Sequence, residues 1–195
     1  MKNKEKVLNI LFILLEVAAI IATIISVGKI QIEFYTEDSN FFALLVTIIY
    51  SYYLFSDKKV PKLVNILRLS SLAMLMITFL TVSLVLVPIY RMDLSLAYWG
   101  PNFFYHLVCP ILFFINYIFF SKKEEFSTKD IFVSIIPTII YGTIITMMNV
   151  IVKGYGPYPF LYVYEQPVYL SVLWILIFLM TNLVITICLS KLKKK

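Results

Sequence analysis

Six long hydrophobic stretches, separated by short polar breaks, constrain the fold of this chain more than any other feature. They cover residues 7–28, 39–55, 63–88, 102–120, 131–152 and 168–190. A run of about 20 apolar residues crosses the hydrocarbon core of a bilayer as a helix. Because lipid offers no partner to free backbone groups, each span is expected to be helical. The sequence therefore predicts an all-α integral membrane bundle of six transmembrane helices, with residues 1–195 forming one domain.

The composition agrees with this fold class. Hydrophobic residues make up 61% of the chain, charged residues only 14%, and the mean hydropathy is +0.91. A soluble domain keeps roughly a quarter of its residues charged. Both cysteines lie inside spans, a single histidine cannot build a multi-histidine metal site, and no glycine-rich phosphate-binding motif is present. We therefore expect neither a metal nor a cofactor.

The distribution of lysine and arginine predicts the orientation of the spans, because cytoplasmic loops carry an excess of both. With the N-terminus inside, fourteen of the seventeen basic residues fall in inner segments. The outer segments hold only Lys29, Arg91 and Lys153. The sequence thus predicts a multi-pass protein of the cell membrane with both termini cytoplasmic and the first span retained as a helix. Its net charge of +6 indicates contact with anionic lipid headgroups rather than with nucleic acid.

Three polar residues lie inside the predicted spans. Glu16 is near the middle of the first span, Arg68 is near the cytoplasmic start of the third, and Asn116 is deep in the fourth. Polar groups at such depths are costly and mark functional sites by default. A pair of Glu16 with Arg68, joined by Asn116, is expected from their similar depths. Such a cluster is either a clasp between helices or part of a reaction site, and an arginine can also extend to the surface.

Residues 34–40 lead into the second span with hydroxyls, carboxylates and an amide. Thr36, Asp38 or Ser39 could cap the helix, because such side chains accept hydrogen bonds from the free N–H groups of a first turn. Acidic residues also suit the positive end of a helix. The hydroxyl of Thr36 could instead, or in addition, be a nucleophile.

His106 is the only histidine and lies one turn into the fourth span. Asn102 stands one turn before it and Pro110 one turn after it. Because proline has no N–H to donate to the carbonyl of His106, a kink and a free carbonyl are expected there. His106 is either an interfacial side chain with its hydrogen bond satisfied locally or a general base, the role that histidine fills most often.

The break before the sixth span contains an aromatic segment, Gly154-Tyr155-Gly156-Pro157-Tyr158-Pro159-Phe160-Leu161-Tyr162. Its glycines and prolines prevent a helix, and its rings suit the headgroup level of a membrane. The segment is therefore either an aromatic belt on a rigid loop or a lip through which an acyl chain enters. The predicted orientation places this segment, Thr36 and His106 on the same, outer side.

Three motifs at these positions resemble one known family. They are Tyr35-Thr36-x-x-Ser39-Asn40, then His106-x-Val108-x-Pro110 followed by Asn116 and Phe120, then Gly156-x-Tyr158-Pro159-Phe160-Leu161. In their order and in the number of helices, they resemble the androgen-induced-protein-like family of membrane proteins, specifically its bacterial branch. The match spans nearly the whole chain. One position departs from it, since the bacterial branch usually has an aspartate where this chain has Asn116.

The resemblance implies a function. Animal members of the family are threonine hydrolases of fatty acid esters of hydroxy fatty acids, and they use a threonine and a histidine within the membrane. Carried over by position, it implies Thr36 as the nucleophile and His106 as its base. Backbone N–H groups beside Asn40 would stabilise the oxyanion, and Asn102 or a free carbonyl would orient the imidazole. Pro110 and Tyr158 are expected to support the site or bind substrate.

Two other classes of function stay open on sequence grounds. One is a non-catalytic lipid-binding or interaction protein of the membrane, and the other is a small transporter. Transporters usually show an internal repeat and helices broken near the midplane. No repeat is evident, although Pro110, Pro137 and Gly142 could break helices. Membrane lipids are the expected partners in every case, with a fatty-acyl ester as the substrate of a hydrolase.

Overall fold

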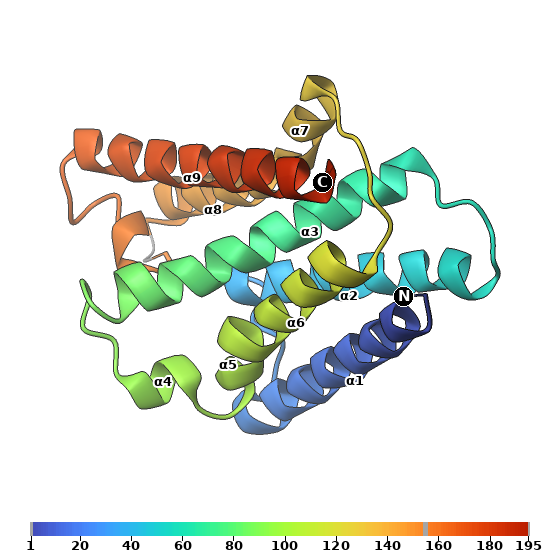
Figure 1. The fold of residues 1–195 in the computed structure, drawn as a ribbon. Coiled ribbons are helices and arrows are strands. Elements are labelled where there is room, and N and C mark those ends of the chain that lie inside the picture. The colour runs from blue at the N-terminus through green and yellow to red at the C-terminus, as the bar shows by residue number, and fades with distance from the viewer. Residues whose placement is uncertain (1, 154–155, 195) are drawn as a thin grey trace.

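The computed structural model describes residues 2–153 and 156–194, and every regular element in that part of the chain is helical (Figure 1). Six helical segments are long and apolar enough to cross a membrane: Lys2–Val27, Tyr35–Phe55, Lys62–Leu86, Pro101–Phe120, Thr128–Val152 and Val168–Lys194. Each of them overlaps one hydrophobic stretch of the sequence. The predicted all-α class is confirmed, and the six helices support a multi-pass membrane protein.

Several of these segments contain more than one element. In chain order the elements are α1 (Lys2–Val27), α2 (Tyr35–Phe55), α3 (Lys62–Thr81), η1 (Val82–Leu86), α4 (Leu94–Tyr98), α5 (Pro101–Phe103), η2 (Phe104–Val108), α6 (Cys109–Ile115), η3 (Asn116–Phe120), α7 (Thr128–Ser134), α8 (Ile136–Val152), η4 (Pro159–Leu161) and α9 (Val168–Lys194). The elements η1, η2 and η3 are π-helical turns, and η4 is a 3₁₀ turn. π-Helical turns are wider than α-helical ones; they are uncommon inside a helix and occur often at functional sites.

Two prolines account for two of the irregularities. Pro110 cannot supply the N–H that would bond to the carbonyl of His106, and the turn just before it is the wider turn η2. Pro137 lies in the first turn of α8, where a missing N–H costs little. The fifth span, predicted as one helix, is therefore two helices that meet at Ile135.

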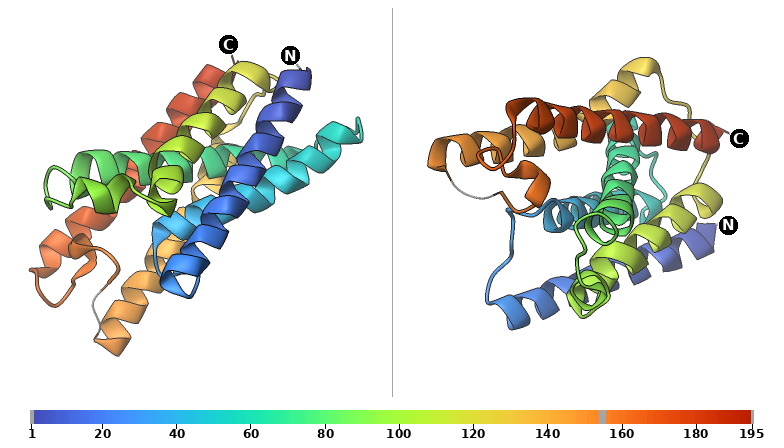
Figure 2. Two further views of the ribbon diagram at one scale, coloured as in Figure 1. Left: turned by 90° about the horizontal axis from the view of Figure 1, so that it is seen from below. Right: turned by 90° about the vertical axis from the view of Figure 1, so that its left-hand side faces the viewer.

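Helix α3 is the centre of the bundle. It packs against α2, α6, α7 and α9, and most of its side chains are buried. By contrast, α1, α8 and α9 turn much of their apolar surface outward. Figures 1 and 2 show α8 and α9 side by side on one flank and α1 on another. Apolar side chains on such outer faces suit contact with lipid tails.

Both termini lie at one end of the bundle (Figure 2). Ion pairs join the segments that were predicted to be cytoplasmic: Lys2 with Asp57, Lys62 with Asp130 at 3.2 Å, and Lys194 with Glu125 at 3.3 Å. Exposed pairs of this kind each contribute little stability. They do show that the terminal segments, the α2–α3 turn and the loop after η3 meet at the same end.

Candidate functional site

Thr36 is the second residue of α2, at the end of that helix away from both chain termini. The helix begins after Phe34, which has extended backbone angles (φ −94°, ψ 133°) and provides no side-chain cap. The expectation that Thr36, Asp38 or Ser39 caps the helix is therefore wrong, because all three lie inside its first turns. The N–H of a second helical residue has no partner within its helix. Both the hydroxyl and the N–H of Thr36 are thus available to groups from other elements.

His106, in η2, is one of those groups. Its Nε2 lies 3.3 Å from the Oγ1 of Thr36, and both side chains are buried. Its Nδ1 lies 2.6 Å from the backbone carbonyl oxygen of Ala97. Because a carbonyl can only accept, Nδ1 carries the ring proton and Nε2 presents its lone pair to the Thr36 hydroxyl. The sequence places these residues 70 positions apart, and the fold brings them into contact.

The carbonyl that orients the imidazole belongs to the short helix α4. Asp93 caps this helix by accepting from the N–H of Ser95 at 2.6 Å, and the hydrogen bonds with Ser95 hold the pKa of the Asp93 carboxyl below its ordinary value. Asn102 donates to the carbonyl of Leu96 at 2.7 Å. Asn102 therefore supports the carbonyl next to the one that holds His106, rather than contacting the ring. Of the two groups proposed to orient the imidazole, the structure selects the backbone carbonyl.

Asn40 connects α2 with η2, the two elements that carry Thr36 and His106. Its side-chain amide donates to the carbonyl of Thr36 at 2.7 Å and to the carbonyl of Tyr105 at 3.4 Å. The first turn of α2 is thereby fixed against η2, next to His106. Because the Nδ2 of this fully buried amide is bonded to those two carbonyls, Asn40 positions Thr36.

Tyr158 reaches Thr36 from the loop before α9. Its hydroxyl accepts from the N–H of Thr36 at 3.4 Å and lies 3.5 Å from Oγ1. Its ring stacks on Phe160, with the ring centroids 5.1 Å apart. Burial raises the pKa of the Tyr158 phenol above its ordinary value, so the hydroxyl keeps its proton and can donate it in a hydrogen bond. The sequence marked Tyr158 as a residue that supports the site or binds substrate, and it gave no indication of this contact.

Gly156 lets the same loop approach α8. A Cβ at this position would lie 2.5 Å from the Nδ2 of Asn149 and 2.7 Å from the Cβ of Leu161, so only glycine fits. Asn149 also donates to the carbonyl of Leu161 at 3.3 Å. The loop that carries Tyr158 is therefore held by contact as well as by its prolines. Gly154 and Tyr155, in the predicted aromatic segment, lie outside the described residues.

An apolar cavity of about 330 Å³ adjoins Thr36. Its walls come from the start of α2, from α3 with η1, from α8, from η4 and from the first half of α9. Thr36 and Tyr158 belong to the wall, and none of the described lining residues is charged. Thr36 thus borders a space of the size of a small-molecule site, whereas His106 contacts Thr36 from outside the described lining. An uncharged, largely apolar ligand matches this lining.

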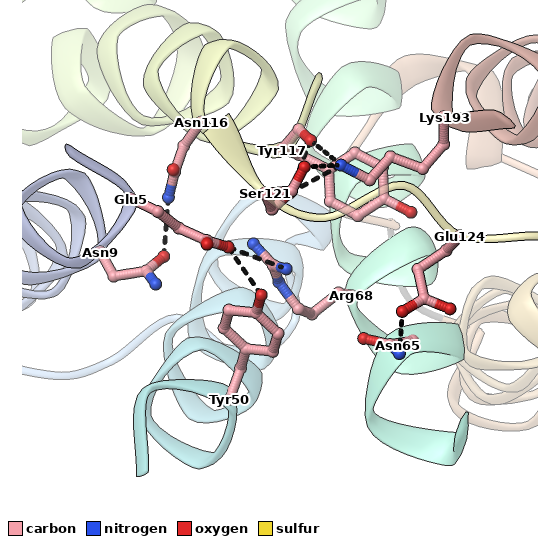
Figure 3. A network of polar contacts seen from close by, with 10 residues as sticks. All are labelled: Glu5, Asn9, Tyr50, Asn65, Arg68, Asn116, Tyr117, Ser121, Glu124 and Lys193. Atoms are coloured by element: carbon pink, nitrogen blue, oxygen red, sulfur yellow. Dashed lines mark hydrogen bonds and ion pairs between the residues drawn. The ribbon is translucent and has the colours of Figure 1, made fainter. Parts of the chain in front are cut away.

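A second buried polar cluster lies towards the termini (Figure 3). The guanidinium of Arg68 lies 3.8 Å from the carboxylate of Glu5 and 3.4 Å from the centre of the Tyr50 ring. Tyr50 donates to the same carboxylate at 2.6 Å. The expected pair of Arg68 with Glu16 is therefore wrong. Glu16 lies 11 positions beyond Glu5, or about 16 Å along the helix at 1.5 Å per residue. An Arg68 side chain that contacts Glu5 therefore does not reach Glu16.

The remaining predicted members of this cluster have other neighbours. Asn116 donates to Asn9 of α1 at 2.7 Å, so it joins α1 to the fourth span without contacting a charge. Glu16 is fully buried beside Cys109 of α6. Lys193, one of the basic residues whose charge was expected to contact lipid headgroups, donates to the carbonyl and to the hydroxyl of Ser121, both at 2.8 Å. These contacts join helices, whereas the groups suited to catalysis gather around Thr36.

Comparisons with protein-family models, with curated proteins and with solved structures found no match to this chain. The indications of function therefore come from the geometry of the site. That geometry combines a hydroxyl, an imidazole with a fixed tautomer, a protonated phenol and an adjoining apolar cavity. Such a set suits nucleophilic attack on an apolar acyl compound.

Proposed function

We propose that this chain is a membrane hydrolase that cleaves fatty-acyl esters, with Thr36 as the nucleophile and His106 as the general base. The contact that carries the proposal is the 3.3 Å approach of His106 Nε2 to Thr36 Oγ1, with Ala97 fixing the tautomer of the ring. A nucleophile within reach of a base, which is itself oriented by a third group, is the arrangement that activates a hydroxyl.

The reaction follows in two halves. His106 Nε2 takes the proton of Thr36 as Oγ1 attacks the ester carbonyl carbon, and the same proton then passes to the departing alcohol. This leaves an acyl ester on Thr36. His106 next takes a proton from water, which attacks the acyl carbon and releases the fatty acid. The proton returns to Thr36 Oγ1, so the protein ends as it began.

The negative charge that develops on the carbonyl oxygen needs donors close to Oγ1. The N–H of Thr36 and the hydroxyl of Tyr158 both lie there, and they bond to each other only weakly at 3.4 Å. Nucleophilic hydrolases commonly use the N–H of the nucleophile itself in this role. We assign these two groups to the oxyanion. The resemblance implied backbone N–H groups beside Asn40 as the oxyanion donors. We keep a backbone N–H in this role and replace the groups beside Asn40 by the hydroxyl of Tyr158.

The substrate class follows from the cavity and its location. The cavity lies among membrane-spanning helices and its described lining residues carry no charge, which favours a fatty-acyl chain over a soluble ester. The resemblance to the androgen-induced-protein-like family favours the same class, and we propose membership of its bacterial branch. We also propose that both termini are cytoplasmic in the cell membrane, which puts the site on the outer side.

Hydrolysis of long-chain acyl esters by purified protein tests the assignment. We expect Thr36→Ala and His106→Ala each to lower the rate by at least about 1000-fold, since members of a nucleophile–base pair act together. Thr36→Ser should keep measurable activity because it retains a hydroxyl. Thr47→Ala is the matched control, since this buried hydroxyl of the same helix bonds only to the carbonyl of Ala43.

Activity that survives in Thr36→Ala would remove the nucleophile from the proposal. A folded wild-type protein that binds acyl esters without cleaving them would favour the second candidate, a non-catalytic lipid-binding protein. The same cavity supports that alternative, because its walls would hold an acyl chain with or without chemistry at Thr36.

A further inference from the structure

Part of the cavity wall also faces the outside of the bundle. Ile139, Thr143 and Met147 repeat every four residues along α8, line the cavity and are exposed. Across from them, Ile175 of α9 lines the cavity and is 38% exposed. Side chains that border a cavity and the exterior at once form its rim. The cavity therefore opens along the seam between α8 and α9, the two helices that lie side by side in Figure 2.

The rim is built from membrane-spanning segments. Both α8 and α9 belong to segments long and apolar enough to cross a bilayer. Once these segments cross a bilayer, hydrocarbon rather than water lies outside the seam. A ligand that passes the seam must be apolar where it crosses, since an unpaired polar group would lose its hydrogen bonds there.

Helix α9 is held much more firmly at one end than at the other. Its buried side chains, among the described residues, are Asn182, Thr186, Leu189, Ser190 and Lys193. All of them lie in the half nearer the C-terminus. The cavity is lined by the other half, through Trp174, Ile175, Phe178 and Leu179. The half of α9 that borders the seam thus buries its described side chains less completely, and it is held by ring contacts of Trp174 and Phe178 with Phe160 at 5.5 and 4.7 Å.

Gly142 leaves space in the cavity wall formed by α8, opposite α9. It lines the cavity from within α8, and a Cβ built on it would meet no atom within 4 Å. Its backbone is helical, so a side chain can be added there without strain. A large residue at this position would project into the cavity and shorten the space available for a chain.

We propose that a single fatty-acyl chain enters the cavity sideways from the membrane through the seam between α8 and α9, and that Gly142 sets the chain length the cavity accepts. The inference rests on the proposed function for the position of the ester at Thr36. A whole phospholipid does not fit this description, because none of the described lining residues could pair with a charged headgroup. The headgroup or alcohol part of the ligand stays outside the uncharged space.

Photolabelling tests the binding site separately from the chemistry. The Thr36→Ala protein, which binds without cleaving, is mixed in lipid nanodiscs with a palmitoyl ester that carries a diazirine near the end of its chain. After illumination, the labelled peptides are identified by mass spectrometry. We expect labels on α8 and on the first half of α9, and competition by unlabelled palmitoyl ester.

Chain-length selection tests the role of Gly142. We expect Gly142→Phe to lower labelling by the palmitoyl ester by about tenfold or more, since several methylene groups lose their buried site. Labelling by an octanoyl ester should change little. Gly142→Ala is the matched control because it adds only a methyl group, and Ile140→Phe places the same ring on the 53% exposed outer face of α8. Ile175→Trp narrows the seam from α9 and serves as the second variant if Gly142→Phe does not fold.

The outcomes separate the two proposals. Labels confined to other helices, or labelling that neither Gly142→Phe nor Ile175→Trp changes, would overturn the entrance and leave the Thr36 chemistry untouched. Labels at the seam, reduced in these variants while wild type hydrolyses no ester, would establish the acyl site and remove the proposed hydrolase.

Discussion

At the scale of single residues, the groups around Thr36 differ in how closely they are fixed. The imidazole of His106 is held by a 2.6 Å hydrogen bond to a carbonyl, whereas the Tyr158 hydroxyl approaches Thr36 at 3.4 Å and 3.5 Å. Catalytic hydrogen bonds are often long before substrate binds and shorten in the transition state. Tyr158 is therefore suited to the role proposed for it, donation to an oxyanion that would exist only in the transition state.

Replacing Tyr158 tests this role. We expect Tyr158→Phe to lower kcat by about 100-fold and to leave KM nearly unchanged, because loss of one oxyanion donor affects the transition state alone. Steady-state kinetics on the ester cleaved by wild type measures both constants. Tyr141→Phe is the control, since that hydroxyl donates to the carbonyl of Glu33 at 2.8 Å although its ring lines the same cavity. A raised KM with unchanged kcat would make Tyr158 a binding residue only.

The sequence singled out candidate site residues by type and position, but it fixed few of their contacts. Thr36 and His106 stood out by residue type and motif, and the packing of α2 against η2, which no sequence pattern fixed, brings them to 3.3 Å. The Glu16–Arg68 pair failed because Glu5, closer to the helix end, is within reach of Arg68. The Ala97 carbonyl had no signal in the sequence, since every residue has a carbonyl and only the fold of residues 90–101 aims this one at His106.

At the scale of elements, two breaks were predictable from proline, but the form of each break was not. The suggestion that Gly142 breaks a helix is wrong, because α8 runs unbroken through it. Pro110 and Pro137 were both identified as residues that could interrupt a helix. Whether a helix widens, as in η2, or divides, as between α7 and α8, depends on what packs against the freed backbone groups. The short helix α4 falls in a polar break and has no apolar periodicity to reveal it.

The end of α9 provides a prediction at this scale. Lys193 donates to the carbonyl of Ser121, just after η3, and so satisfies backbone groups left free at the end of the fourth span. We expect Lys193→Met to destabilise the protein by about 1–3 kcal/mol, since buried acceptors lose their donor. Thermal unfolding in detergent would show a lower Tm. Lys194→Met removes only an exposed pair with Glu125, and an equal loss of stability there would contradict the role given to Lys193.

At the scale of the whole molecule, charge and fold give a consistent arrangement. The segments that carry the excess of basic residues meet at the end that holds both termini, and the α2–α3 turn meets them there through Lys2 and Asp57. Thr36 begins α2 at the other end of that helix, and Tyr158 reaches it from the loop before α9. The number of spans could be read from hydropathy because each break is short and polar. The packing of the spans could not be read from hydropathy, because nearly every face of these helices is apolar.

Labelling of single cysteines tests the orientation of this arrangement. In a Cys188→Ser background, where Cys109 is buried, we expect Glu165→Cys to react with a membrane-impermeant maleimide in intact cells. Lys59→Cys, in the α2–α3 turn, should react only after the membrane is permeabilised. The reason is the basic excess on the side of Lys59, which cytoplasmic loops retain. The reverse pattern would mean that the protein has the opposite orientation in the membrane. Thr36 and the seam between α8 and α9 would then lie nearer the cytoplasmic leaflet, and the acyl chain would have to come from that leaflet.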